Sequence, residues 1–278
     1  MAAAAGFKER HLVNSPGSDS PYNSDSLHKV GEDRMSSAGD PTWIGKTLPS
    51  DAEVRQHEWW IDPREYARHE ARRGRRFAFV SLVPARTALV VIDMVPFFVS
   101  ENPYCRGIVP NIGRIADALR AAGGTVAWVL PAVGERTPVR DEFFGPETAE
   151  AYRVSGGTGP LPERLWPELV VRPGDVLVEK SAPSAFFPGR CVLAGVLEER
   201  GVDTVLISGT VTNVCCESSA RDAATLGLRV ILVADANAAR RDQDHNATLH
   251  TIYRSFGDVR STSDLLDMVQ AADRARPT

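Results

Sequence analysis

The sequence predicts a three-layer, doubly wound α/β sandwich built on a mainly parallel, six-stranded sheet. Short aliphatic runs such as "TALVVIDM" (87–94) are apolar at nearly every position, which is typical of strands buried on both faces of a parallel sheet. These runs alternate with stretches of helical periodicity, as expected for strand–helix–strand units. Hydrophobic residues make up 43% of the 278 residues, enough for a large core.

The first part of the chain differs from the rest in composition. Residues 1–45 are rich in Ser, Gly, Asp and Pro and nearly free of periodic apolar residues, so we expect them to be disordered. Residues 46–84 are predicted to form a helical arm, with a helix that starts at Asp62-Pro63 and ends at Gly74. Trp59 and Trp60 indicate that the arm packs against its own domain or a neighbouring subunit.

A run of arginines follows in the same arm. We interpret it as a solvated helix face, with a polyanion site as the alternative. Its members are Arg64, Arg68, Arg72, Arg73, Arg75 and Arg76.

Residues 85–278 carry the repeated strand–helix pattern in order. After the first strand we expect strands at 125–130, 175–180, 203–209, 229–235 and 258–262, and helices at 108–124, 189–201, 213–225, 242–257 and 263–275. The connection from 131 to 173 is too long for a plain loop, and loops of this size usually serve function. We expect it to form a pocket wall or lid, or a subunit contact.

Composition excludes several function classes. A net charge of −4 gives no electrostatic reason to expect nucleic acid or an anionic membrane surface. No stretch approaches the roughly 18 apolar residues of a membrane helix, and "MAAAAGFKERHLV" does not have the pattern of a signal peptide. Four cysteines form neither a disulfide framework nor a zinc-like spacing. We expect a cytoplasmic protein with a small-molecule ligand.

Polar residues end three of the predicted strands. In open parallel sheets, ligands bind beyond the carboxyl ends of the strands. Asp93 ends the first run, although such a carboxylate could equally cap a loop. Lys180 ends the third run, and beyond residue 46 it is the one lysine in a sequence whose other positive charges are arginines. A compact ammonium beside a nucleophile cannot be replaced by a guanidinium. The alternative is that this lysine was retained by chance and has no such role.

The fourth run leads into "GTVTNVCCESSARDA" (209–223), which contains adjacent cysteines. With Asn213 as helix cap, Cys216 aligns with Ala220 and Ala223 on a core-facing stripe. Cys215 lies about 100° round the helix and faces the rim. The helix N-terminus and a nearby ammonium favour a thiolate. We therefore predict Cys215 as nucleophile, Asp93 as its base and Lys180 as the group that orients both.

With Asp, Lys and Cys at the ends of the first, third and fourth predicted strands, the chain resembles the isochorismatase-like cysteine hydrolases over roughly residues 85–270. The matching segments are "ALVVIDM", "VEKSAPSAFF" and "GTVTNVCCESSARDA". In the family the cysteine follows a T-N/D-x step, which again selects Cys215. The resemblance implies strand order 3-2-1-4-5-6, a homo-oligomer, a cis peptide before Val211, and an oxyanion hole made by the N–H groups of Val211 and Cys215.

The motifs "TNVCCESSARDA", "DANAA" and "FGDV" look most like ureidoacrylate and related carbamoyl amidohydrolases. Departures lie in the pocket: Val95-Pro96 replaces a common Gln, and Pro131, Val133 and Pro183 replace polar or aromatic residues. We therefore expect a more apolar substrate. Its expected lining is Phe97, Phe98, Trp128, Phe186 and Phe187.

The expected activity is cysteine-dependent hydrolysis of an amide, ureido or carbamoyl C–N bond through a thioester, because true isochorismatases lack the nucleophilic cysteine. The D-x-H-x-x-x-H metal pattern of the family's nicotinamidases is missing, so we expect no metal and no cofactor.

Three alternatives stay open. The first is a hydrolase of lactams or cyclic amides in natural products, as streptothricin hydrolases are. The second is a redox sensor with a Cys215–Cys216 bridge, which would be strained. The third is a non-catalytic ligand-binding or scaffold protein that docks through Trp59-Trp60.

Overall fold

The computed structural model describes residues 53–275. The predicted disordered segment 1–45 therefore lies outside the described residues. Six parallel strands form one sheet in the order β3-β2-β1-β4-β5-β6, as predicted. The strands are β1 (Thr87–Ile92), β2 (Thr125–Pro131), β3 (Val176–Lys180), β4 (Thr204–Thr210), β5 (Arg229–Ala238) and β6 (Asp258–Arg260).

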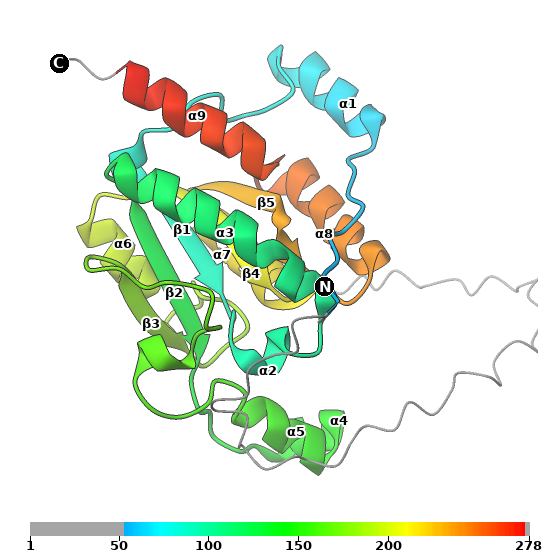
Figure 1. Ribbon diagram of the computed structural model, residues 1–278. Helices are drawn as coiled ribbons and strands as arrows, with labels where there is room; N and C mark the ends of the chain where they lie inside the picture. The colour runs from blue at the N-terminus through cyan, green and yellow to red at the C-terminus, as the bar shows by residue number, and fades with distance from the viewer. Residues whose placement is uncertain (1–52, 276–278) are drawn as a thin grey trace, which may run out of the picture. The chain divides into compact units, whose positions relative to one another are not determined.

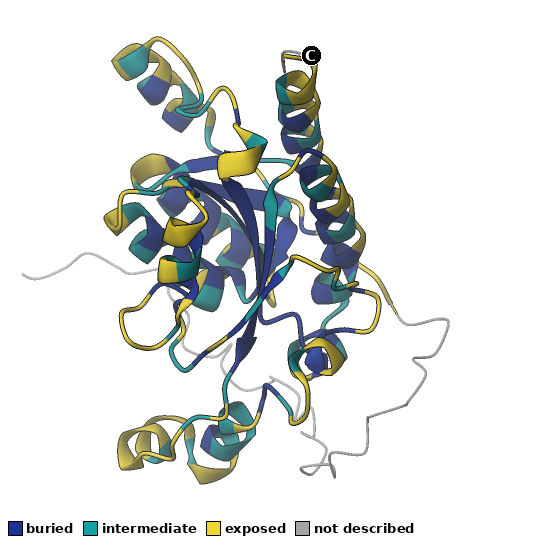
Figure 2. Ribbon diagram, turned by 90° about the vertical axis from the view of Figure 1, so that its left-hand side faces the viewer, coloured by how far each residue is buried: buried dark blue, intermediate teal, exposed yellow. Residues whose placement is uncertain are grey.

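Helices cover both faces of the sheet, which gives the three layers (Figure 1). On one face, α3 (Pro103–Ala121) and α9 (Thr262–Arg274) pack over the strands. On the other face lie α6 (Leu193–Glu199), α7 (Glu217–Thr225) and α8 (Asp242–Ser255). Every residue of β1 is buried, and Figure 2 shows the sheet as a continuous buried layer between the helices. The aliphatic runs read from the sequence are thus strands with two apolar faces.

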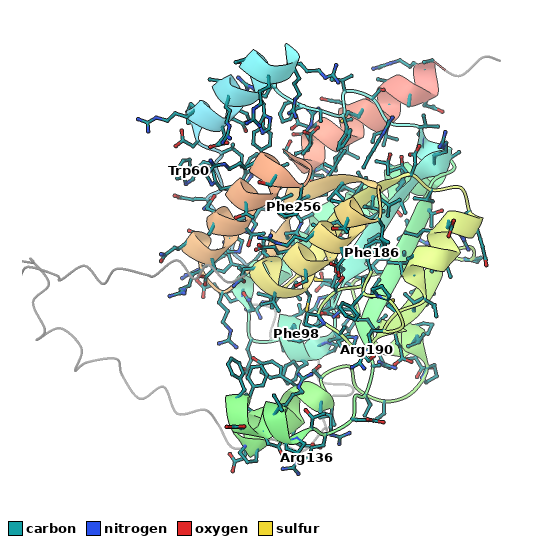
Figure 3. All side chains as sticks on the ribbon, turned by 180° about the vertical axis from the view of Figure 1, so that it is seen from behind. Trp60, Phe98, Arg136, Phe186, Arg190 and Phe256 are labelled. Atoms are coloured by element: carbon teal, nitrogen blue, oxygen red, sulfur yellow. The ribbon has the colours of Figure 1, made fainter. Side chains whose placement is uncertain are left out.

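The arm contains α1 (Pro63–Arg73), and its ends are those that the sequence predicts. The Asp62 side chain accepts a hydrogen bond from the N–H of Arg64, and Gly74 ends the helix in the left-handed conformation with φ 70°. Trp60 is 60% exposed, and Figure 3 shows it on the outside of the arm. Its backbone N–H donates to Asn246 Oδ1 of α8, so the arm packs against its own domain.

The connection after β2 is more regular than predicted. It contains α4 (Pro138–Phe144), α5 (Pro146–Arg153) and the short 3₁₀ helix η3 (Leu161–Arg164). Proline stands at the start of each of these helices, where its missing N–H costs nothing. The α4–α5 pair lies at the end of the sheet where α2 (Pro96–Val99) follows β1 (Figure 1). The remaining short helix, η2 (Pro84–Arg86), precedes β1.

Candidate active site

Asp93, Lys180 and Cys215 come together beyond the carboxyl ends of β1, β3 and β4. Lys180 Nζ lies 2.8 Å from Asp93 Oδ2 and donates to Cys215 Sγ at 3.5 Å. It also donates to the carbonyl oxygen of Ala182 at 3.2 Å. The ammonium thus bridges the carboxylate and the thiol, as a group that orients both must.

Asp93 is held in an unusual backbone conformation directly after β1. Its φ is 55°, in the left-handed region that aspartate tolerates better than most residues. Its N–H donates to the carbonyl oxygen of Val129, which fixes the loop against β2. The carboxylate is buried, and Oδ1 has no hydrogen-bond partner within residues 53–275. One carboxylate oxygen is therefore engaged by Lys180 and the other is available to accept a proton.

The segment after β4, which we call the cysteine turn (Thr212–Cys216), differs from the sequence prediction. It forms a π-helical turn with Val211 in the cap position, not an α-helix capped by Asn213. The N–H of Cys216 donates to the carbonyl oxygen of Val211 at 3.2 Å, and α7 begins only at Glu217. The wider turn inserts one residue before α7, a local feature often found at functional sites. The Thr210–Val211 peptide bond is cis, as the resemblance implied.

The two cysteines face different environments. Cys216 is fully buried and packs in the core with Ala220 and Ala223, as predicted. Cys215 is half-buried and points at Lys180. Both thiols are free. Because the adjacent side chains diverge, this geometry does not support the redox-sensor alternative.

Two buried features that the sequence analysis did not single out shape this end of the sheet. Gly209, with φ 110°, brings β4 so close to β1 that an added Cβ would lie 2.1 Å from the carbonyl oxygen of Ile92. Asn237 donates to the carbonyl oxygens of Ile207 and Val233, bridging the irregular register between β4 and β5. The glycine was visible in the sequence, but only the register shows which backbone it must approach.

Burial dominates the electrostatics of the cluster. Burial first, and then the nearby Asp93, raise the pKa of the Cys215 thiol to about 12, against the lowering influence of Lys180. Burial likewise raises the pKa of Asp93, against the opposing influence of Lys180. Burial alone would lower the pKa of Lys180, but Asp93 and Cys215 raise it above its ordinary value. These influences favour a neutral Cys215 thiol beside the Lys180 ammonium, so burial opposes the thiolate that the helix N-terminus was expected to favour.

The predicted aromatic lining is only partly assembled at this end of the molecule. Phe97 and Phe98 on α2 contact each other edge to face at 4.9 Å between ring centroids. The ring centroids of Phe97 and Tyr152 of α5 are 5.9 Å apart, and those of Tyr152 and Phe144 of α4 are 5.3 Å apart. Tyr152 and Phe144 were not predicted, because they lie in the long connection. Phe97 and Phe144 are about 40% exposed, so an aromatic wall joins α2 to α4–α5.

Trp128 was expected in the pocket, and the structure corrects this expectation. It is buried in the core between the sheet and α3, and its indole N–H donates to Asp175 Oδ2 at 2.8 Å. Asp175 precedes β3, so the ring points toward the amino ends of the strands. Phe186 is also buried, in the core of the opposite face, whereas Phe187 is half exposed.

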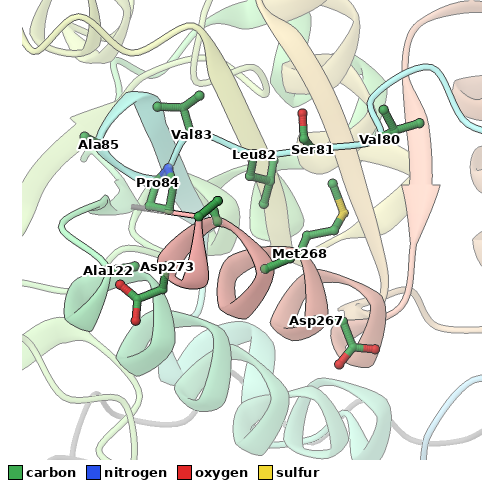
Figure 4. Close-up of a pocket in the computed structure, with 13 residues that line it drawn as sticks. Val80, Ser81, Leu82, Val83, Pro84, Ala85, Ala122, Asp267, Met268 and Asp273 are labelled. Atoms are coloured by element: carbon green, nitrogen blue, oxygen red, sulfur yellow. The ribbon is translucent and has the colours of Figure 1, made fainter. Parts of the chain in front are cut away.

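A cavity of about 570 Å³ lies at the other end of the sheet, between residues 80–85 and α9 (Figure 4). None of its lining residues belongs to the cluster around Cys215. Within residues 53–275, no group of three or more His, Cys, Asp and Glu side chains is arranged to hold a metal ion. No helix in that part of the chain is long and apolar enough to cross a membrane.

The sheet order and the Asp–Lys–Cys cluster together define an isochorismatase-like α/β hydrolase. A family model described as "Isochorismatase domain" matches residues 87–264. The chain belongs to the isochorismatase family, and it is a hydrolase.

Relatives and solved structures agree with this assignment. An uncharacterized isochorismatase family protein, YwoC of Bacillus subtilis (strain 168), is 33% identical over 188 residues, which cover 66% of this chain and 95% of YwoC. Ureidoacrylate amidohydrolase RutB of Agrobacterium fabrum (strain C58 / ATCC 33970) is 29% identical over 216 residues, 69% of this chain and 94% of RutB. A cysteine hydrolase from Pseudomonas syringae pv. phaseolicola 1448A matches with a TM-score of 0.62 and 29% identity, over 70% of this chain and 98% of its own.

Proposed function

We propose that the protein hydrolyses an amide, ureido or carbamoyl C–N bond of a small molecule through a thioester on Cys215. The observation that carries the proposal is the bridging of Asp93 and Cys215 by Lys180, at 2.8 Å and 3.5 Å. Two relatives are named for this bond type: ureidoacrylate amidohydrolase RutB, and an N-carbamoylsarcosine amidase from Thermoplasma acidophilum that is 26% identical, with a TM-score of 0.53 over 64% of this chain and 96% of its own.

The first half of the reaction forms the thioester. As Cys215 Sγ attacks the substrate carbonyl carbon, its proton passes to Asp93, whose raised pKa makes it a stronger base than an ordinary aspartate. The N–H groups of Val211 and Cys215 stabilise the oxyanion. The protonated Asp93 then donates to the leaving nitrogen, the C–N bond breaks, and amine or ammonia departs.

The second half restores the enzyme. Asp93 takes a proton from water, the hydroxide adds to the thioester carbonyl, and the carboxylic or carbamic acid leaves as the C–S bond breaks. Asp93 returns the proton to the sulfur, so one water is consumed and no redox partner is needed. Lys180 stays protonated throughout, and its ammonium stabilises the negative charge of the intermediates.

We further propose an apolar substrate that lies against Phe97, Phe98 and Phe187. The exposed aromatic wall formed by Phe97, Tyr152 and Phe144 supports an apolar binding surface.

The four free cysteine thiols are consistent with a reducing cytoplasm, and we expect a homo-oligomer.

The test is ammonia release from a panel of N-carbamoyl, ureido and simple amide compounds, measured on wild type, Cys215→Ala and Cys216→Ala, with intact-mass detection of acyl adducts. We expect turnover and any trapped adduct to vanish in Cys215→Ala. Cys216→Ala, a matched change one residue away, should keep its activity. Equal turnover by wild type and Cys215→Ala would refute the thioester mechanism.

A further inference from the structure

The arm contacts a residue that supports the cysteine turn, and it lies outside the matched family domain, which begins at residue 87. Before α1, the chain passes between α3 and α8. The N–H of Arg55 donates to the carbonyl oxygen of Pro103 at 3.0 Å, and the N–H of Trp60 donates to Asn246 Oδ1 at 2.9 Å. His57 lies between these two attachments.

The His57 ring is sandwiched between two other rings. It stacks on Tyr104 of α3 at 4.0 Å and on His245 of α8 at 4.2 Å between centroids, with interplanar angles of 5° and 10°. The N–H of Ala239 donates to His57 Nε2 at 3.0 Å, so this nitrogen carries no proton. Nδ1 therefore carries it and donates to Asp242 Oδ1 at 2.6 Å. The ring is neutral, and burial lowers its pKa.

His245 continues the contact to the cysteine turn. Its Nδ1 lies 3.0 Å from Thr212 Oγ1, and Thr212 is the first residue of the turn that carries Cys215. His245 is fully buried, and burial, with His57 alongside, lowers its pKa to about 3, so it is neutral at physiological pH. The path from the arm to the turn thus consists of one ring stack and one hydrogen bond.

We propose that His57 is a positioning residue for the cysteine turn. Stacked on His245 and bonded to Ala239 and Asp242, it fixes the ring that holds Thr212, and through the turn it fixes the direction of Cys215 Sγ toward Asp93 and Lys180. The proposal rests on the proposed function of Cys215 as nucleophile. It assigns a part in the chemistry to a segment that precedes the family domain.

The experiment removes the two ring nitrogens of His57 while keeping an aromatic ring at this position. His57→Phe retains an aromatic ring for the stack but loses both ring-nitrogen hydrogen bonds. His69→Phe is the matched control, because His69 is a buried histidine of the same arm that packs edge-on against Tyr253, away from the cysteine turn. Both full-length variants are treated with iodoacetamide at pH 8, and the alkylation of each cysteine is followed by peptide mass spectrometry.

We expect Cys215 of His57→Phe to react at least five times faster than in wild type, because a loosened turn lets water reach the thiol and lowers its raised pKa. The buried Cys105 and Cys216 should stay unreacted, which excludes global unfolding. On the best panel substrate, kcat should fall at least tenfold with KM within twofold. His69→Phe should match wild type in both measurements.

Equal Cys215 alkylation in His57→Phe and His69→Phe would overturn the proposal, as would parallel exposure of all four cysteines. These outcomes are separable from failure of the proposed function, which Cys215→Ala reports independently. If Cys215→Ala is inactive while His57→Phe turns over normally, the nucleophile stands and the positioning role falls.

Discussion

At the residue level, the cluster places charged groups and a thiol together in a buried site. Lys180 is enclosed, and its ammonium meets a carboxylate, a thiol and a backbone carbonyl within hydrogen-bonding range. A guanidinium is wider and presents its donors as a planar fork. The geometry therefore requires lysine at this position.

Replacing Lys180 tests that requirement. We expect Lys180→Arg and Lys180→Met each to lower kcat/KM at least a hundredfold, about 3 kcal/mol of transition-state stabilisation. In Lys180→Arg the planar guanidinium does not fit the space of the ammonium. In Lys180→Met the buried Asp93 loses its counter-ion. Thermal unfolding checks that both variants fold. Activity of Lys180→Arg within a few-fold of wild type would contradict the argument.

The raised pKa of Cys215 makes a separate prediction about pH. A thiol with a pKa of about 12 is almost wholly protonated at pH 7, and the thiolate fraction increases tenfold for each pH unit below that pKa. Alkylation of Cys215 by iodoacetamide in the free enzyme should therefore keep accelerating between pH 7 and 10. Cys215→Ala shows which part of the alkylation belongs to Cys215. An alkylation rate that stops increasing below pH 9 would show that Cys215 is a thiolate in the resting enzyme.

At the scale of elements, sequence periodicity predicted all six strands and the ends of α1, because buried parallel strands and capped helices leave local signals. The cysteine turn was not predicted correctly. The turn contacts β5 and α8, and the hydrogen bond between Thr212 and His245 joins residues 33 positions apart, so no short-range sequence pattern reports it. Asp93, Lys180 and Cys215 could be proposed together because each lies at or shortly after the carboxyl end of a strand, whereas His57 carries no such signal.

Gly209 allows β4 to approach β1 closely. The end of β4 approaches β1 so closely that Gly209→Ala would place a methyl group against the carbonyl oxygen of Ile92, at a φ that alanine rarely adopts. We expect a loss of at least about 3 kcal/mol in the free energy of unfolding, measured by urea denaturation. Gly113→Ala in α3 is the control, since its added Cβ meets no atom within 4 Å. Similar stability of the two variants would contradict the close approach.

At the scale of the whole molecule, buried carboxylates tie distant segments together. Asp258 of β6 is fully buried and accepts hydrogen bonds from the N–H groups of Ala78 and Phe79, which anchors the arm to the last strand. Asp175 joins three segments, since it accepts from Arg120 of α3, Trp128 of β2 and the N–H of Arg172. The stability of the fold should therefore depend on the ionisation of Asp175.

Asp175 sets the sign of that dependence. Burial alone would raise its pKa, but hydrogen bonds from Arg120, Trp128 and Arg172, together with the charge of Arg120, lower it below the ordinary value. An acid with a depressed folded-state pKa stabilises the fold above its unfolded pKa, and this contribution is lost as pH falls through the folded pKa. Asp175→Asn should thus unfold at lower urea concentration than wild type at pH 7. The gap between the two midpoints should shrink as pH falls below about 4. A gap independent of pH would mean that Asp175 acts through packing, and not through its charge.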